Sequence, residues 1–475
     1  MSTESKSKVS IRHPSHIKMS PQWKKCRVTS AGQKAVHDAG TDYLPKLSGQ
    51  DDTKYNAYKS RAQFFNAVWS TVKVMVGMLM RKAPTVEVPG AVKALMENIT
   101  GDGKDFDTFC TQIATEMETV GRVGILVDHP PVDAEGLTVA VAERMNLRPT
   151  MNYYKTESIT NWKRAIINNK RTTVMVTLHE MADISTDEFS HDTEERYRVL
   201  DLINVEDEKT GDTSLVYRVR VFKVVEGEDI LLETRYPLLD GEPLSEIPFF
   251  FISTDDTTPE VEEPPLIDLV DCALAWYRLD ADLKHGLHFT GLPTPVVTGH
   301  RIPDGDKLCI GSTEAWVFAE PDADAKYLEF EGQGLSAIST EKDKQIEQMA
   351  VLGSRHIGVE KKDSETAQTA QIHRAGEDGS LSSIAVTMGT GMTQALRMFC
   401  AWAGSPSETV LVTINKDFVS ASINPQELIA WVGAVVSGSM SPQVFFWNLQ
   451  QKEAIPPDLT FEEHQAQLES GSRII

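Results

Sequence analysis

The stretch PPLIDLVDCALAWYRLDADLKHGLHFTGLPTPVVTG, residues 264–299, begins the part of the chain that decides the fold. Its apolar residues recur at steps of three or four, which predicts an amphipathic helix from Leu266 to about His288. Glycine and proline then end the helix. The architecture is therefore expected to contain a long helix that stops abruptly at a loop.

The segment after this helix is expected to leave the helical pattern and then return to it. EAWVFAE (314–320) and KYLEFE (326–331) predict a strand pair around the PDAD turn. A second helix is predicted over residues 336–352, followed by the loop GSRHIGVEKKDS (353–364) and a helical region over 365–402. This order of helix, small β-excursion, returning helix, loop and long helix is the most informative feature of the sequence.

The last helical region contains glycines that are expected to interrupt it near Gly376 and Gly389. The triplet Gly389-Thr390-Gly391 lies among apolar residues at helical spacing and does not follow a predicted strand. A dinucleotide-binding loop connects a strand to a helix. The triplet therefore favours a bend or close packing over a nucleotide site.

The first half of the sequence predicts helices followed by an antiparallel sheet. Apolar spacing indicates one long helix over residues 55–80 and a second over 106–120, which leads into the buried strand GILVD (124–128). Between Tyr153 and Tyr236 the apolar period becomes two, which is typical of strands with one wet face. The fold class is therefore expected to be α+β.

The charge balance excludes one class of nucleic-acid binder. The 475 residues include 47 Lys and Arg and 69 Asp and Glu, so the formal net charge is −22 and the pI is near 5.0. Phosphate contacts require Lys and Arg, so a protein with this balance is a poor candidate for gripping DNA or anionic lipid with its bulk surface. An acidic protein can still surround DNA without holding it.

Cysteine usage and hydropathy indicate in which cellular compartment the chain is made and whether it enters a membrane. The cysteines are scattered without a CxxC pair, which argues against a disulfide framework and a zinc knuckle and favours synthesis in a reducing cytoplasm. The longest apolar runs, IPFFFI and LIAWVGAVV, are much shorter than the roughly 18 residues of a membrane span, so no membrane association is expected. The cysteines are Cys26, Cys110, Cys272, Cys309 and Cys400.

The N-terminal segment has the opposite charge to the rest of the chain. Residues 1–30 contain seven basic residues and one acidic residue, which gives +6. Residues 1–40 are therefore predicted to form a basic, flexible arm. Such an arm is either a solvated tail or an electrostatic contact for nucleic acid or an acidic neighbour, and the sequence leaves both open.

Catalytic motifs are not evident, and no cofactor or metal is expected. The sequence lacks the GxxxxGK[ST] phosphate loop of a motor ATPase and the GxSxG elbow of a hydrolase. His179-Glu180 begins like a zinc-protease helix, but position 183 is Asp183. His285 and His288 have no evident third ligand, so a polar helix face is the simpler interpretation.

Six phrases, taken together and in order, resemble a family of tailed-bacteriophage portal proteins, the podovirus-type group catalogued as a domain of unknown function. The resemblance covers roughly residues 40–475, and no single phrase is a catalytic fingerprint. The phrases are YLPKLSGQDDTKYNAYKSRAQFFNAVWSTVKVMVGMLMRKAP (43–84), ETVGRVGILVDHP (118–130), YYKTESITNW (153–162), residues 264–299 quoted above, QIEQMAVLGSR (345–355) and SETAQTA (364–370).

The resemblance implies a subunit of a ring of about twelve copies around a central DNA channel. Its fold would be α+β, with a helical stem and crown and a mixed α/β wing. The implied parts are the wing (41–263), a first stem helix (264–290), the clip (291–334), a second stem helix (335–352), a channel-facing tunnel loop (353–364), a long wing helix (365–404) and the crown (405–475).

The resemblance also implies a function and partners. A portal protein forms the DNA channel at one capsid vertex of the virion, nucleates head assembly, joins head to tail and lets DNA leave at ejection. The implied partners are double-stranded DNA in transit, the terminase large subunit, the major capsid and scaffolding proteins and a head-tail adaptor protein. The portal itself would be no enzyme, since ATP hydrolysis would belong to the terminase.

The implied tunnel loop is basic in an otherwise acidic chain. Arg355, Lys361 and Lys362 would form belts of positive charge in a ring and hold DNA weakly and transiently. The alternative is a solvated basic turn balanced by Asp363 and Glu365. At the level of the whole protein, the alternatives are another phage head or adaptor structural protein, or a hydrolase with an unrecognised site.

Overall fold

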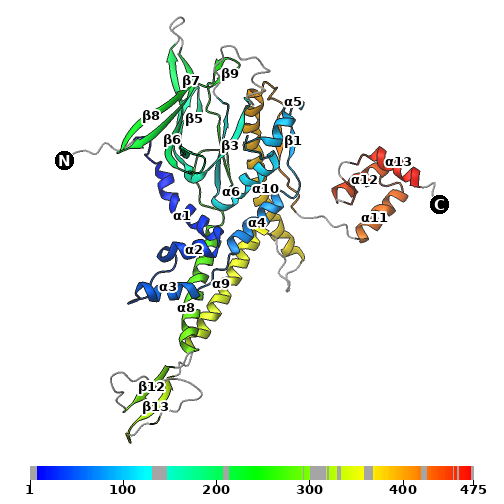
Figure 1. The fold of residues 1–475 in the computed structure, drawn as a ribbon. Coiled ribbons are helices and arrows are strands. Elements are labelled where there is room, and N and C mark those ends of the chain that lie inside the picture. The colour runs from blue at the N-terminus through cyan, green and yellow to red at the C-terminus, as the bar shows by residue number, and fades with distance from the viewer. Residues whose placement is uncertain are drawn as a thin grey trace.

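The fold belongs to the α+β class, as predicted. Figure 1 shows a main body of helices and sheets, a projection formed by α8 and α9 with the strands β12 and β13 at its tip, and the helices α11–α13 set to one side. The computed structural model describes residues 8–130, 147–206, 213–291, 294–299, 317, 320–328, 333–357, 367–418, 425–452, 454–456 and 459–471.

Residues 14–39 are part of the body, which corrects the flexible arm expected over residues 1–40 for this range, while residues 1–7 lie outside the described residues. Residues Pro14–Ala31 form α1 and Gln33–Ala39 form α2. The side chains of Trp23 and Cys26 on α1 are fully buried in the main core. The basic residues concealed an apolar stripe at helical spacing, because net charge does not register which face of a helix each residue occupies.

The helix predicted over residues 55–80 is two helices, α3 (Asp52–Arg61) and α4 (Ala67–Leu79). Asn66 ends the intervening bend and caps α4, because its side chain accepts a hydrogen bond from Trp69 N at 3.0 Å. Both helices turn apolar residues toward the same core, so the apolar periodicity runs through the break. A 3₁₀ turn, η1 (Gly40–Asp42), precedes them.

The second predicted helix and the strand after it are confirmed as α6 (Phe106–Val120) and β2 (Arg122–Asp128). Asp105 caps α6 by accepting a hydrogen bond from Thr108 N at 2.7 Å. Gly121 ends the helix with φ of 85°, a left-handed conformation that favours glycine. The short elements before α6 are β1 (Thr85–Glu87), α5 (Gly90–Lys93) and η2 (Ala94–Asn98).

A three-stranded antiparallel sheet lies at the centre of the body. Its strand order is β11 (Phe249–Ser253), β2, β3 (Thr150–Lys155), and α10 packs against all three strands. The apolar run IPFFFI provides β11, whose Phe251 and Ile252 are buried. This sheet therefore joins the first third of the sequence to the part that follows residue 248.

α10 (Ala367–Trp402) is one uninterrupted helix, which corrects the breaks expected at Gly376 and Gly389. The close-packing interpretation of the glycine triplet is confirmed. A Cβ atom at Gly391 would lie only 2.4 Å from Ile252 Cγ1 of β11. Glycine lets the helix lie close to the sheet at this position. The strand after α10 is β14 (Leu411–Thr413), which pairs antiparallel with β1.

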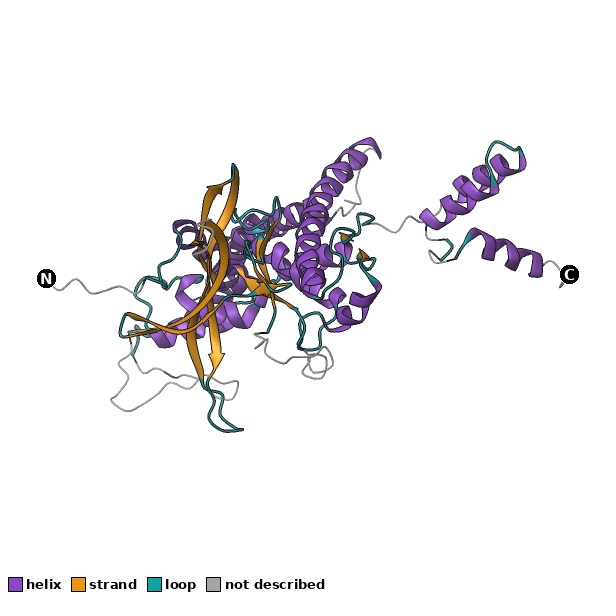
Figure 2. Ribbon diagram, turned by 90° about the horizontal axis from the view of Figure 1, so that it is seen from above, coloured by secondary structure: helices purple, strands orange, loops and turns teal. Residues whose placement is uncertain are grey.

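A second, five-stranded antiparallel sheet has the order β4-β5-β6-β7-β8 and flanks the helices of the body (Figure 2). The strands predicted between Tyr153 and Tyr236 are confirmed, and the turn residues Asn168 and Asn169 of the β4–β5 hairpin have φ of 49° and 62°. The strands are β4 (Ile159–Ile167), β5 (Lys170–Asp183), β6 (Thr193–Glu206), β7 (Thr213–Val225) and β8 (Glu228–Arg235), with η3 (Thr156–Ser158) before them and β9 (Leu238–Leu239) and β10 (Glu242–Pro243) after them.

The two helices of the projection are α8 (Ile267–Thr290) and α9 (Gln333–Ile357), close to the predicted ranges. At the tip, the second strand of the predicted pair is observed, but with a partner on the other side of the loop. β13 (Asp324–Leu328) pairs with β12 (Thr294–Thr298), whereas most of the expected partner, 314–320, lies outside the described residues. No strand was predicted at 294–298, and Pro295 is compatible with one because a two-stranded ribbon has outer edges where a missing N–H costs little.

The C-terminal unit contains α11 (Pro425–Val436), α12 (Pro442–Gln451) and α13 (Phe461–Gly471). A capping box begins α13. Thr460 Oγ1 accepts a hydrogen bond from Glu463 N at 3.2 Å, and Glu463 Oε2 accepts one from Thr460 N at 3.0 Å. Figures 1 and 2 both show these helices apart from the main body.

Candidate functional site: the projection formed by α8 and α9

The projection is an antiparallel pair of long helices. At 1.5 Å per residue, the 24 residues of α8 span about 36 Å. The helices approach closely near the tip, since a Cβ atom at Gly286 would lie 2.4 Å from Leu335 Cδ2. At the other end, a Cβ atom at Gly353 would lie 3.3 Å from Thr71 Oγ1 of α4. α9 is therefore closely packed against α8 near the tip and against α4 at its other end.

A buried charge network ties α8 to α9. Asp280 is 1% exposed, and Lys342 Nζ of α9 lies 2.5 Å from its Oδ1. Lys284 Nζ lies 3.4 Å from Asp280 Oδ2, and Gln63 N donates to the same oxygen at 2.7 Å. Lys342 Nζ also lies 4.5 Å from the ring centroid of Trp276. A charge buried this deeply is tolerated because each of its oxygens has partners.

The N-terminal helices brace the same helix. Tyr58 of α3 donates a hydrogen bond to Asp282 Oδ1 at 2.5 Å. Burial, together with this hydrogen bond, raises the pKa of Tyr58 well above its usual range. Arg278 Nε donates to Tyr43 O at 2.9 Å. The base of the projection is therefore fixed by segments more than 200 residues away in the sequence.

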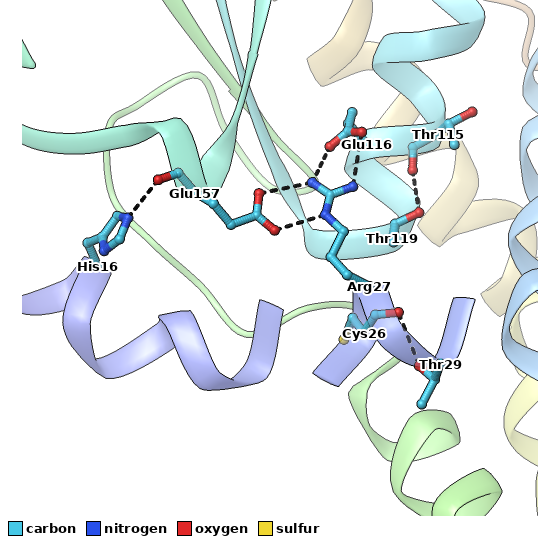
Figure 3. A network of polar contacts seen from close by, with 8 residues as sticks. All are labelled: His16, Cys26, Arg27, Thr29, Thr115, Glu116, Thr119 and Glu157. Atoms are coloured by element: carbon cyan, nitrogen blue, oxygen red, sulfur yellow. Dashed lines mark hydrogen bonds and ion pairs between the residues drawn. The ribbon is translucent and has the colours of Figure 1, made fainter. Parts of the chain in front are cut away.

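Arg27 holds α1 to the body (Figure 3). Its guanidinium bonds Glu116 of α6 through Nη1 at 3.0 Å and through Nη2 at 2.5 Å, and it bonds Glu157 of η3 through Nε at 2.8 Å and Nη2 at 3.0 Å. Burial opposes the charge of Arg27, but the hydrogen bonds to Glu157 and Glu116 outweigh it and raise its pKa. For Glu157, burial is outweighed by the bond from Arg27, which lowers the pKa of the carboxyl.

The exposed face of α9 is rich in hydroxyl and acidic groups. Six exposed residues at steps of three and four along the helix have hydroxyl, carboxylate or methyl side chains, and the exposed Lys344 follows Thr340 at the same spacing. Lys344 lies beside this face, and its Nζ is 3.2 Å from Glu341 Oε2. Such a face repels phosphate and offers it few cationic contacts. Its residues are Ser336, Ser339, Thr340, Asp343, Glu347 and Ala350.

The structure places one of the three basic residues predicted to face a channel. Arg355 belongs to the last turn of α9, because the helix continues to Ile357. The expected loop over residues 353–364 is therefore corrected at its start, where five of its residues are helical. Lys361 and Lys362 lie outside the described residues.

The buried contacts of the projection were not predicted from the sequence. Asp280 follows Tyr277 and precedes Ala281 on the apolar stripe of α8, and both neighbours are buried. An acidic residue within an apolar stripe is the signal that could have pointed to a buried ion pair. The identity of its partner Lys342, which is 62 residues away, depends on how the two helices align.

The histidines considered as metal ligands have other partners. His179 lies on β5, where its Nε2 is 3.7 Å from Glu195 Oε2 of β6, so it does not begin a zinc-protease helix. The ring of His285 packs edge-on against Tyr58, with 5.2 Å between centroids, and burial lowers its pKa. Within the described part of the chain, no three His, Cys, Asp or Glu residues gather as metal ligands would.

Across the residues that the structure describes, no helix combines the length and the apolarity needed to cross a bilayer.

One protein-family model matches residues 265–403, and its description is a domain of unknown function (DUF4055). The match begins two residues before α8 and ends one residue after α10. It therefore contains the complete projection and the long helix, but less than half of the chain. No curated protein matches the chain.

Three solved structures of gene transfer agent (GTA) particles contain similar chains. A chain from the neck of a native particle, computed with C12 symmetry, has 11% identity and a TM-score of 0.40, over 81% of this chain and 89% of that chain. One from the neck of an empty particle, computed with C6 symmetry, has 11% identity and a TM-score of 0.39, over 89% and 98%. One from the virion of a native particle has 12% identity and a TM-score of 0.38, over 86% and 96%.

Proposed function

We propose that the chain is a portal protein, a subunit of a ring of about twelve copies that encloses a DNA channel at one vertex of a phage or phage-like capsid. The ring nucleates head assembly, admits the genome during packaging, joins head to tail and releases DNA at ejection. The low TM-scores given above carry no part of the argument, which rests on the architecture and chemistry of this chain.

The observation that carries the proposal is the order of elements between residues 264 and 404. A long helix leaves the body, a small β-ribbon forms the tip, a second long helix returns antiparallel, and an uninterrupted 36-residue helix then crosses the central sheet. The plan that the family resemblance implies has the same sequence of parts. The closely packed and braced helix pair has the rigidity that a channel wall requires.

The electrostatics of α9 support the same proposal. In the ring, the hydroxyl-rich and acidic face of α9 lines the channel. A wall of this kind repels the phosphates and keeps the duplex centred, so DNA can slide without forming contacts that must then be broken. The net charge of −22 therefore fits a protein that encloses moving DNA.

The observed elements support a division of the proposed ring subunit into parts. We assign α8 and α9 to the stem, residues 291–332 to the clip, 358–366 to the tunnel loop and α10 to the wing. The rest of the wing contains the two larger sheets together with α1–α6, and residues 405–475 form the crown. The clip contacts the terminase large subunit and later the head-tail adaptor, while major capsid and scaffolding proteins contact the wing. The portal carries no catalytic site.

Electron microscopy of the purified full chain in negative stain tests the proposal most directly. Rings of about twelve subunits with an open central channel are expected. Monomers at every protein concentration and salt condition would overturn the proposal. Rings without a channel wide enough for a duplex would instead favour a different head or adaptor component.

A further inference from the structure

The C-terminal unit, α11–α13, carries a surface without charge. Residues 428–451 contain no Asp, Glu, Lys or Arg, although charged residues make up 24% of the chain. This segment forms most of α11, all of α12 and the turn between them. A solvent-facing helix of an isolated protein normally has charges on its outer face. The composition therefore indicates a surface that another surface covers.

The large apolar side chains in this segment are exposed. On α11, Ile429 is 71% and Val436 is 83% exposed, and Val432 lies between them on the same face. On α12, Trp447 is 58% exposed, with Val444 one turn before it. We call these five residues the crown apolar surface. Gly433 adjoins it, and a Cβ atom there would meet nothing within 4 Å, so the face is open to close approach.

The unit has little core of its own. Phe446 is the buried apolar residue among its described side chains, and it lies outside the main core of the protein. Its ring packs against Phe461 and His464 of the last helix, with centroid distances of 5.5 and 5.1 Å. Figures 1 and 2 show no part of the body over these helices. A unit of this size needs an additional source of stability.

The usual sources for so small a unit are disulfides, a metal or association with another surface. The sequence after Cys400 contains no cysteine, so a disulfide is excluded. The described residues form no metal-ligand cluster. Association therefore remains as the way in which the crown apolar surface is buried.

We propose that the crown apolar surface docks onto the crown apolar surface of the neighbouring copy of this chain, with the α11 face of one subunit against the α12 face of the next. The net charge of −22 opposes contact between copies through surfaces of average composition, but not through a charge-free one. An α11-to-α12 contact is heterologous, so it can repeat around a closed ring. This inference rests on the proposed ring, which holds successive units at a high effective concentration.

The test uses the full chain with Val436→Lys and, separately, Trp447→Lys. Because both side chains are more than half exposed, the substitutions leave the subunit folded, and a lysine near the C-terminal end of α11 suits the helix dipole. Each substitution is expected to raise the protein concentration at which half of the chain is in rings by about tenfold or more, because it desolvates a charge in the contact. Mass photometry and sedimentation velocity across a concentration series measure this value.

The matched control is Phe189→Lys, which changes an 82% exposed apolar residue between β5 and β6. It is expected to leave assembly unchanged.

A second measurement locates the contact. Chains carrying Val436→Cys and chains carrying Val444→Cys are mixed, assembled and oxidised, and a cross-linked dimer is expected only in the mixture. The unaltered chain under the same oxidation reveals any dimer formed by the native cysteines.

The outcomes separate this inference from the proposed function. If the unaltered chain forms rings but the two lysine variants assemble at the same concentration and the mixture does not cross-link, docking between copies is wrong and the portal proposal stands. If the unaltered chain stays monomeric under all conditions, both proposals fail. If the variants form normal rings but lose binding of purified scaffolding protein, the surface belongs to that partner and docking between copies is wrong.

Discussion

The α8–α9 projection and the C-terminal unit α11–α13 are both helical and both stand out from the body, but they differ in how they use charge. The projection buries Asp280 between its helices and satisfies it with Lys342, Lys284 and a backbone N–H. The C-terminal unit has neither charges nor a substantial core along residues 428–451.

The difference suggests that the two regions of one subunit are stabilised in different ways. A buried and fully paired charge specifies one alignment of two helices, because a shift along the axis would leave it unpaired. An uncharged apolar surface does not by itself specify one alignment with its surroundings. It contributes to stability when a partner covers it. The alignment of α8 with α9 is thus fixed by contacts within the subunit, whereas the C-terminal unit is expected to be held in place by contacts formed on assembly.

The largest loss of unfolding free energy is expected from Asp280→Ala. The substitution leaves two lysines and the N–H of Gln63 without their acceptor in a closed site, which costs about 3–5 kcal/mol of unfolding free energy. The lower unfolding midpoint is measured by thermal or denaturant melts of the full chain. Glu341→Ala, which breaks an exposed ion pair on the same projection, is the control and should change little. Equal midpoints for the two variants would contradict the comparison.

A smaller effect is expected from Arg27→Met, because its side chain and that of Glu157 are about a quarter to a third exposed. At pH 7 the loss is about 1–3 kcal/mol, since two neighbouring carboxylates lose their shared donor. The lowered pKa of Glu157 means that its contribution is present above about pH 4.5, its ordinary value, and is lost as the pH falls through the folded pKa.

The pH dependence of that variant provides its check. The gap in unfolding free energy between the unaltered chain and Arg27→Met should narrow as the pH drops below about 4.5, as Glu157 becomes protonated. Lys34→Met, which removes an exposed pair with Asp38, is the matched control. A gap that widens on acidification would show that Arg27 does not act through the carboxylates.

Phe446→Ala should have a local effect. Its ring is the centre of the small contact between α12 and α13, and it lies outside the main core. In the monomer, amide hydrogen exchange in α12 is expected to become faster while exchange in α8 and the main unfolding midpoint stay unchanged. A fall in the main midpoint comparable to that of Asp280→Ala would mean that the unit is an integral part of the body.

The smallest effect on stability, and a purely functional one, is expected from Lys361→Ala combined with Lys362→Ala. If these lysines form a basic belt in the channel, the variant particles should retain less DNA or package a shorter length, while the subunit melts normally. Lys34→Ala, an exposed lysine on α2, is the control. Unchanged packaged length and retention would remove the proposed role of the loop.

Much of the fold could be predicted from local patterns, and the failures have identifiable physical causes. Apolar spacing gave α6, α8 and α9 within a few residues, and period-two alternation gave the β4–β5 hairpin with its Asn168-Asn169 turn. Periodicity could not locate the break between α3 and α4, because both helices face the same core and the pattern runs through the bend. The positive net charge of residues 1–30 likewise led to the prediction of a flexible arm where α1 forms, although α1 has a buried stripe that contains Trp23.

The candidate site was less predictable than the elements that carry it. The order of helix, tip, helix and long helix was visible in the sequence, but Arg355 was expected in a loop and lies in α9. The glycines of α10 look like helix breakers when read alone. They remain in an unbroken helix, and Gly391 lets this helix lie close to Ile252 of the sheet.

The sequence by itself determined the α+β class, the acidic surface, the long helices and the charge-free segment 428–451, because each follows from composition or from short-range spacing. Tertiary structure alone decided that Asp280 meets Lys342, that Arg27 joins Glu116 to Glu157, and that α10 stays straight over its glycines. These contacts join residues far apart in the chain. Their energies depend on burial and alignment, which no local pattern contains.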